Sequence, residues 1–217
     1  WCDWSSDVCS SDLAEKVESK GLAGTVFTAV TPKGKMRLRV NVPGRHMVSN
    51  ALAAVAIGLE LGLDEKQIAA GVAAFKPVSG HSSIVETDRF TIMDDCYNAN
   101  PVSTKAGLDV LAEAEERKVA ILGDMFELGS DERKLHYEVG EYAADKGIDC
   151  IVCAGELAKE YYDGAKAAGK TEGLYYFATR DEAVERLKNI VKENDAILVK
   201  ASHGMKFEKI VEVLKQM

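Results

Sequence analysis

Short apolar runs alternate with longer amphipathic stretches through the second half of the chain. The short runs are typical of buried strands, whereas apolar residues that recur every three or four positions are typical of helices. This alternation predicts an α/β fold, a Rossmann-like domain whose parallel sheet has helices on both faces. The expected strands are Phe90–Met93, Lys118–Leu122, Cys150–Ala154, Leu174–Phe177 and Ala196–Val199, and the expected helices are Val102–Ala114, Asp131–Lys146, Glu156–Ala168, Asp181–Glu193 and Lys206–Gln216.

Residues 14–81 form a smaller first part with a different pattern. Two alternating runs on either side of Pro32–Gly34 predict a hairpin of the strands Thr25–Val30 and Met36–Val42. The best domain boundary is the segment Lys76–His81, so the Rossmann-like domain is expected to occupy residues 86–217.

Two helices are expected after the hairpin. Met47–Leu61 is apolar almost all round, which predicts a buried helix that ends at Gly62. Asp64 and Gln67 have the spacing of a capping box and so begin the second helix. Its apolar stripe is formed by Ile68, Val72 and Phe75.

Residues 1–13 (WCDWSSDVCSSDL) show neither a helical nor a strand period. The run Asp7–Leu13 resembles the translation of a sequencing-adapter sequence, so we expect residues 1–13 to be a non-native tail. The alternative is a genuine disordered tail, because such segments also lack a pattern.

Composition narrows the class of protein. A hydrophobic content of 47% and a charged content of 29% are typical of a globular protein, and the net charge of −8 argues against a nucleic-acid partner. No apolar run approaches the roughly 20 residues that cross a bilayer, and the N-terminus lacks the pattern of a signal peptide. We therefore expect a cytoplasmic protein without a membrane partner. Cys150 and Cys153 lie on opposite faces of one predicted strand, which favours buried core residues over a redox or metal pair.

Ligands of open parallel sheets bind outside the carboxyl ends of the strands, so the loops there are the candidate sites. The loop Asp94–Pro101 is the most informative. Asp95 could accept hydrogen bonds from ribose hydroxyls, Tyr97 has a flat face for a base, and Asn98 has the donor and acceptor that an adenine edge requires. The alternative is an ordinary strand-to-helix turn in which Asn100 caps the next helix.

Three further polar groups stand out. His46 and Asn50 are spaced to share one helix face, as nucleotide contacts or as an internally satisfied capping pair. The segment Gly123–Gly129 places Asp124 and Glu127 between two glycines, with His136 following later. The segment Lys200–Lys206 is another strand-to-helix turn, with Ser202 as the expected cap and lysines that suit a carboxylate or phosphate.

Together and in this order, these groups resemble the motifs of the Mur ligase family. The family pattern G-x-H-x-x-x-N-A-x-A-A matches Gly44–Ala54, and L-G-D-M-x-E-L-G matches Leu122–Gly129. D-D-x-Y-N-A-N-P matches Asp94–Pro101 and indicates the D-alanyl-D-alanine-adding branch. V-K-x-S matches Val199–Ser202. The resemblance covers about residues 20–217, and residues 14–81 would then be a remnant of the family's central ATP-binding domain.

The resemblance implies an ATP-dependent amide ligase of peptidoglycan synthesis. Such an enzyme uses ATP and Mg²⁺ to convert the terminal carboxylate of UDP-MurNAc-tripeptide to an acyl phosphate, which the amino group of D-Ala-D-Ala attacks. It implies ATP contacts for His46, Asn50, His81, Asp95, Tyr97, Asn98 and Asn100, and peptide-substrate contacts for Asp124, Glu127, Lys200 and Ser202. A monomer is expected, and no metal ligand or certain catalytic residue is assigned within this chain.

The sequence also departs from the family pattern. We expect the Gly-rich phosphate loop, the magnesium carboxylate and the UDP-binding domain to be missing, so the chain by itself is expected to be inactive. His81 and His203 stand where the family usually has arginines, and Ala201 replaces a glycine. The alternatives are a sister Mur ligase, a folate polyglutamate ligase, or a non-catalytic nucleotide-binding or interaction module of the same fold.

Overall fold

The computed structural model describes residues 13–217, so residues 1–12 of the predicted tail lie outside the described residues. The chain divides into two compact units, the first ending at Lys76 and the second spanning Pro77–Met217. No helix in the described part is long and apolar enough to cross a membrane.

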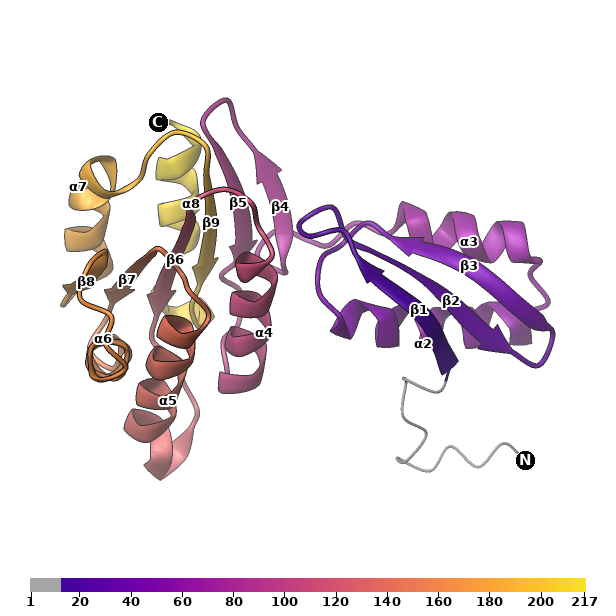
Figure 1. Ribbon diagram of the computed structural model, residues 1–217, viewed down its shortest axis with the longest axis horizontal. Helices are drawn as coiled ribbons and strands as arrows, with labels where there is room; N and C mark the ends of the chain where they lie inside the picture. Colours follow the sequence, from indigo (N-terminus) through magenta and orange to yellow (C-terminus); the bar gives the residue numbers. More distant parts are fainter. Residues whose placement is uncertain (1–12) are drawn as a thin grey trace. The chain divides into compact units, whose positions relative to one another are not determined.

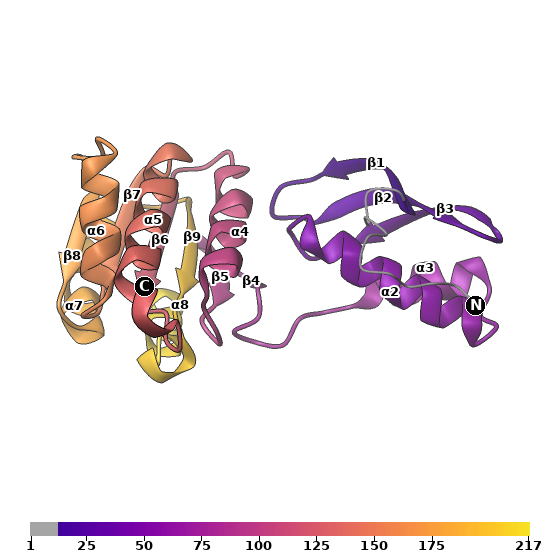
Figure 2. The ribbon, with the colours of Figure 1, turned by 90° about the horizontal axis from the view of Figure 1, so that it is seen from below.

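The first unit is a three-stranded antiparallel sheet with two helices against one face (Figures 1 and 2). Its elements are β1 (Ala14–Ser19), β2 (Thr25–Thr31), β3 (Gly34–Val40), α2 (His46–Glu60) and α3 (Glu65–Ala74). The predicted hairpin is confirmed, since Thr31 pairs with Gly34 at its tip. The strand β1 was not predicted. Its register on β2 shifts between Glu15 and Glu18, and this irregularity breaks the two-residue period.

The prediction that the first helix is buried all round is wrong. Only one face of α2 packs into the core, and Ile57 and Leu61 are 62% and 73% exposed. The helix ends as expected at Gly62, whose positive φ lets the N–H of Leu63 bond the carbonyl of Gly58. Near-continuous apolar composition therefore did not mean burial on every side.

The second helix of this unit begins as predicted. The side chain of Asp64 accepts from the N–H of Gln67, and the side chain of Gln67 accepts from the N–H of Asp64. Ile68 and Val72 are buried, but Phe75 is half exposed. Phe75 already lies outside the helix in an extended conformation, so it leaves the apolar stripe.

The second unit is a six-stranded sheet in the order β4-β5-β9-β6-β7-β8, parallel except for β4, which confirms the predicted α/β fold. The helices α4, α5 and α6 cover one face, and α7 and α8 cover the other (Figures 1 and 2). The strands are β4 (Ser83–Glu86), β5 (Phe90–Asp95), β6 (Lys118–Gly123), β7 (Cys150–Ala154), β8 (Leu174–Phe177) and β9 (Asp195–Lys200). The helices are α4 (Pro101–Ala112), α5 (Glu132–Asp145), α6 (Ala158–Ala167), α7 (Arg180–Ile190) and α8 (Glu208–Lys215). Short 3₁₀ turns lie at Gly129–Asp131 and His203–Met205.

The second unit begins earlier than residue 86. Residues 77–85, placed in or before the boundary by composition, belong to it. The strand β4 pairs with β5, and the buried carboxylate of Asp94 accepts from Ser79 Oγ and the N–H of Gly80, both at 2.9 Å. The division after Lys76 lies within the predicted boundary segment Lys76–His81, but the second unit starts before the expected residue 86, because these bonds depend on a residue that lies distant in the sequence.

The three described cysteines are free and buried. Cys150 packs in the core on the α7–α8 side of the sheet, and burial raises the pKa of its thiol to about 11. Cys153 is equally buried but lies outside that cluster. Both behave as the small core residues that were predicted.

The helices α5 and α6 cross at two glycines. A Cβ atom on Gly140 would overlap the carbonyl of Tyr161 in α6, and one on Gly164 would overlap the carbonyl of Tyr137 in α5. Each glycine therefore makes room for the backbone of the other helix. This close approach holds α6 beside the loops that end β6 and β7.

We predict that G140A and G164A each lower the free energy of unfolding of the second unit by about 2 kcal/mol or more, since backbone cannot yield to the added methyl group. G107A in α4 is the matched control. Its Cβ would meet only side-chain atoms, Leu198 Cδ2 at 3.3 Å and, in ordinary van der Waals contact, Lys200 Cδ at 3.7 Å, so alanine's better helix propensity should keep the change within about 1 kcal/mol. Urea denaturation followed by circular dichroism measures all three, and equal losses would contradict the glycine crossing.

Candidate functional site

The polar loops converge at the carboxyl edge of the sheet, where β5, β9 and β6 are neighbours. Asp94 and Asp95 are the last two residues of β5, rather than loop residues as the sequence suggested. Asp94 is 2% exposed, and its carboxylate also accepts from Cys96 Sγ at 3.0 Å. Its role is to hold residues 79–80 and 96 around the end of the strand.

Asp95 and Lys200 form a buried ion pair. They are opposite each other in the register of β5 and β9, and Lys200 Nζ lies 2.5 Å from Asp95 Oδ2. Lys200 also donates to the carbonyl of Asn98 at 3.0 Å, and Ser82 donates to Asp95 Oδ1 from both its N–H and its hydroxyl. The side chain of Lys200 is 2% exposed, so it is held inside the protein rather than offered to a peptide substrate.

Most acceptor positions of Asp95 are thus already used. A carboxylate has about four lone-pair sites, and Ser82 and Lys200 fill three of them. The side chain is 13% exposed. One acceptor position remains for a ribose hydroxyl, which is the contact that the sequence predicted.

Tyr97 stands at the centre of an aromatic cluster. Its ring stacks on His81 at a centroid distance of 4.2 Å and an interplanar angle of 29°, and it lies 5.2 Å from the ring of His203. Tyr97 is 51% exposed, and its N–H donates to the carbonyl of Gly80. The two histidines that replace the family's usual arginines therefore meet on one tyrosine.

The two predicted asparagines have different positions. Asn98 is exposed, and its backbone carbonyl accepts from Lys200. Asn100 Oδ1 accepts from the N–H of Ser103 at 2.9 Å and completes a capping box at the start of α4. The capping alternative therefore describes Asn100 correctly, while the side-chain amide of Asn98 points to no bonding partner within residues 13–217.

Asp124 does not face the solvent. It is 5% exposed, and its Oδ1 accepts from the N–H of Ala158 at the start of α6. A Cβ atom on Gly155 would overlap this carboxylate, so the glycine makes room for it. Burial raises the pKa of Asp124. In this structure the Asp124 carboxylate therefore anchors the start of α6.

Ser202 links the loop after β9 to the loop after β6 through two hydrogen bonds. Its N–H donates to the carbonyl of Asp124 at 3.0 Å, and its Oγ accepts from the N–H of Phe126 at 2.9 Å. The expected role as a cap is wrong, because a 3₁₀ turn follows it and α8 begins only at Glu208. Glu127 is exposed at φ +63°, a region that residues other than glycine rarely adopt.

His136 is fully buried beside this loop. The N–H of Met125 donates to Nε2 at 2.9 Å, and Nδ1 lies 2.6 Å from the carbonyl of Glu132. A neutral ring that carries its proton on Nδ1 satisfies both bonds. Burial lowers the pKa of His136, so the residue supports the loop and does not serve as a cation.

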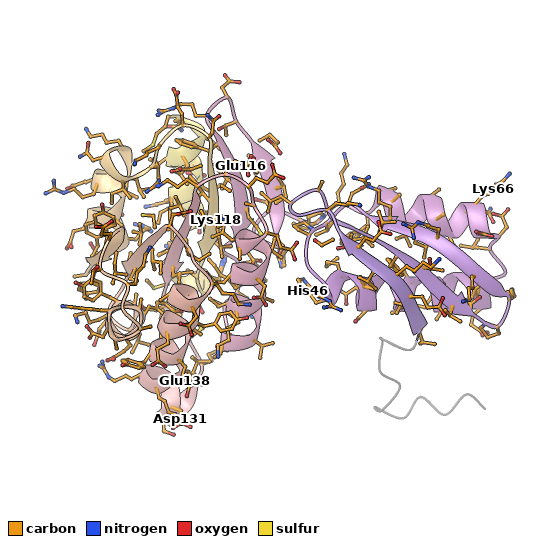
Figure 3. The ribbon with its side chains drawn as sticks, viewed as in Figure 1. His46, Lys66, Glu116, Lys118, Asp131 and Glu138 are labelled. Atoms are coloured by element: carbon orange, nitrogen blue, oxygen red, sulfur yellow. The ribbon has the colours of Figure 1, made fainter. Side chains whose placement is uncertain are left out.

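His46 and Asn50 belong to the first unit, whereas all other predicted site residues belong to the second. His46 is the first residue of α2 (Figure 3). Both side chains are exposed, so they lie off the buried face of the helix. Asn50 Nδ2 makes only a weak contact with Met47 Sδ at 3.6 Å. The N-cap of the helix is Arg45, and its side chain makes no capping hydrogen bond.

The letters of a phosphate loop do occur, at Gly164–Thr171 (GAKAAGKT). They do not form one. The segment is the end of α6 and the turn after it, with Gly169 at φ +90° and Lys170 Nζ donating to the carbonyl of Asp149. A phosphate loop lies before a helix, where free N–H groups and the positive end of the dipole face the anion. Here the segment ends a helix, and the N–H groups of residues 168–170 donate to carbonyls of the same helix, so this occurrence of the pattern does not have the geometry of a phosphate loop.

The described residues contain no cluster of side chains that could bind magnesium as they stand. No three His, Cys, Asp or Glu side chains between residues 13 and 217 gather closely enough to hold a metal ion. The carboxylates of the site are instead bonded to Ser82, Lys200 and the start of α6.

Several residues of this edge escaped the sequence analysis. Ser79 and Ser82 bind the two aspartates, and Phe126 and Arg180 contact the loop after β9. The only sequence signal for these residues was the adjacent pair Asp94 and Asp95, because carboxylates that become buried require hydrogen-bond donors from other segments. The donors themselves lie in unremarkable serine-rich and charged segments.

We predict that K200M lowers the free energy of unfolding of the second unit by about 3 kcal/mol, because it leaves the Asp95 carboxylate without its buried cation. The double variant D95N/K200M should lose less than the sum of D95N and K200M. K215M on α8 is exposed and is the control. Urea unfolding of the four variants tests the pair, and additive losses would contradict it.

His136 predicts a pH dependence of stability. Its pKa in the folded chain lies below the ordinary value of 6.5, so the unfolded chain takes up a proton first as the pH falls. The contribution of His136 to the free energy of unfolding is therefore fully present above pH 6.5, and it is lost as the pH falls toward the pKa of the folded state. In H136Q this loss should disappear, because glutamine does not titrate.

The measurement is the unfolding free energy of wild type and H136Q between pH 7.5 and 5.5. Asp124, whose pKa is raised, acts in the opposite sense and interacts electrostatically with His136, so the same comparison is made in a D124N background to isolate His136. Parallel pH profiles would show that His136 does not titrate between the folded and unfolded states.

The chain is similar to known proteins along most of its length. The family described as "Mur ligase, glutamate ligase domain" matches residues 82–203, more than half of the 217 residues. The UDP-N-acetylmuramoyl-tripeptide--D-alanyl-D-alanine ligase of Escherichia coli (strain K12) is 36% identical over 196 residues, which cover 89% of this chain and 42% of the relative. The chain thus spans less than half the length of that relative.

Solved structures have the same fold. MurF from Acinetobacter baumannii superposes with a TM-score of 0.83 at 29% identity, covering 94% of this chain and 44% of that protein. The MurF ligase from Thermotoga maritima in complex with ADP superposes with a TM-score of 0.76 over 94% of this chain and 45% of that protein, and at 21% identity it shows the fold alone. The family match, the relative and the fold agree, and the chain belongs to the Mur ligase family.

Proposed function

We propose that this chain is the C-terminal part of an ATP-dependent ligase that adds D-Ala-D-Ala to UDP-MurNAc-tripeptide in the cytoplasm. The observation that carries the proposal is the loop Asp94–Pro101, whose Asp95, Tyr97 and Asn98 gather at the carboxyl edge of the sheet. Its support is the name of the E. coli relative, which states both substrates, and the ADP in the T. maritima structure.

The residues suggest a division of labour. The exposed ring of Tyr97 and the exposed amide of Asn98 would hold the adenine, and the last acceptor position of Asp95 would hold the ribose. Asp124, Lys200 and Ser202 would act by fixing the loops, since all three are buried and internally bonded. Glu127 remains exposed at the loop end and is the candidate for a peptide contact.

The reaction itself would run through an acyl phosphate. ATP would phosphorylate the tripeptide carboxylate, and the amine of D-Ala-D-Ala would displace phosphate to form the amide. Magnesium and the groups that hold the ATP phosphates would be supplied by parts of the full-length ligase other than residues 13–217, as the family resemblance implies. His46, Asn50 and His81 would complete the nucleotide contacts together with the side-chain nitrogen of Asn100, whose Oδ1 caps α4. The full protein would act as a monomer.

The test joins the upstream part of the E. coli ligase to residues 14–217 of this chain. We expect phosphate release that requires ATP, UDP-MurNAc-tripeptide and D-Ala-D-Ala, and we expect none from the 217-residue chain alone. A hybrid that folds but stays inert with all three substrates would favour a non-catalytic module. Activity with glutamate or another amino acid in place of D-Ala-D-Ala would favour a sister ligase or a folate polyglutamate ligase.

Tyr97 provides a residue-level prediction. In the hybrid, Y97A should raise the KM for ATP about tenfold, because stacking of a base on an aromatic ring is lost. Y175A is the matched control, since Tyr175 is a similarly exposed tyrosine on the edge strand β8. An unchanged KM in Y97A would place the adenine elsewhere.

A further inference from the structure

The loop between β9 and α8 contacts both neighbouring loops of the candidate site. Ser202 in this loop bonds Asp124 and Phe126 in the loop after β6. His203 lies against Tyr97 in the loop after β5. The conformation of residues 201–206 therefore decides how the nucleotide-binding and peptide-binding loops meet.

This loop has a conformation that needs support. A 3₁₀ turn spans His203–Met205, and Lys206 follows it at φ +54°, ψ +46°. The left-handed region is unfavourable for a residue with a side chain, so it persists only where the surroundings enforce it. The loop's own bonds are Met205 N–H to the carbonyl of Ser202 and Lys206 N–H to the carbonyl of His203.

Arg180 supplies the support from a different connection. It is the first residue of α7, and its Nη1 donates to the carbonyls of Met205 at 3.4 Å and Lys206 at 3.3 Å. Asp181 holds the guanidinium through Nε at 2.9 Å and Nη2 at 2.5 Å. The side chain is only 15% exposed. The guanidinium thus links the Asp181 carboxylate on α7 to the backbone carbonyls at the end of the loop.

We propose that Arg180 is a positioning residue, which sets residues 203–206 so that His203 meets Tyr97 at the nucleotide loop. The planar fork of arginine presents several donors at fixed angles, and lysine has a single nitrogen. The consequence for ligand binding rests on the proposed function, whereas the consequence for the loop stands on the contacts alone.

The experiment compares wild type, R180Q, R180K and R186Q as 217-residue chains. Arg186 is an exposed arginine on the same helix and is the matched control. Amide hydrogen exchange at Met205 and Lys206 should speed up about tenfold in R180Q, as local support is lost, and stay unchanged in R186Q. The ring protons of His203 should lose the chemical shift that the nearby ring of Tyr97 imposes.

R180K should resemble R180Q, since one lysine nitrogen cannot replace the three guanidinium nitrogens that together bond Asp181 and the two carbonyls. Unchanged exchange and an unchanged His203 signal in R180Q would overturn the proposal, as would full rescue by lysine. A general loss of stability would instead speed exchange throughout α7 and β9, which would also overturn it.

Binding of ADP to the same four proteins separates the two proposals. We expect weaker binding in R180Q and R180K than in wild type and R186Q. A loosened loop with unaltered ADP affinity would contradict the role of the loop in nucleotide binding. Absence of ADP binding by the wild-type chain would count against the proposed nucleotide site, while the exchange result would still decide the role of Arg180.

Discussion

The buried pair of Asp95 and Lys200 is the constraint on which the site depends. A charged lysine that is 2% exposed is tolerated only with a partner charge and further acceptors, and Asp95 and the carbonyl of Asn98 provide them. The pair joins the ends of two adjacent parallel strands. Through Ser82 it also binds the segment that enters the second unit, so one ion pair fixes three segments.

This constraint explains why the predicted ligand residues fall into two groups. Asp124, Lys200 and Ser202 are polar residues at the right edge of the sheet, yet each satisfies a buried group of the protein itself. By contrast, the side chains of Tyr97 and Asn98 are exposed to solvent. The buried residues hold the loops in place, and these two side chains remain exposed.

The opposite edge of the sheet shows how the function of a motif depends on its structural setting. GAKAAGKT at Gly164–Thr171 has every letter of a phosphate loop, but it ends a helix instead of beginning one, so its dipole would repel an anion. Gly164, the first residue of this segment, instead faces α5 and, together with Gly140, lets α5 and α6 approach each other closely. Conversely, His81 and His203, which depart from the family pattern, both lie against the ring of Tyr97.

The sequence by itself determined the α/β architecture, because periodicity and caps are local: β7 and β8 lie where the apolar runs predicted them, and the capping residues Asp64 and Asn100 begin their helices. It also determined the family, because the motifs are contiguous. Tertiary structure alone decided that β4 pairs with β5, that α2 leaves Ile57 exposed and that Lys200 turns inward to Asp95. Burial and pairing depend on groups far apart in the chain, and no local pattern records which of them will meet.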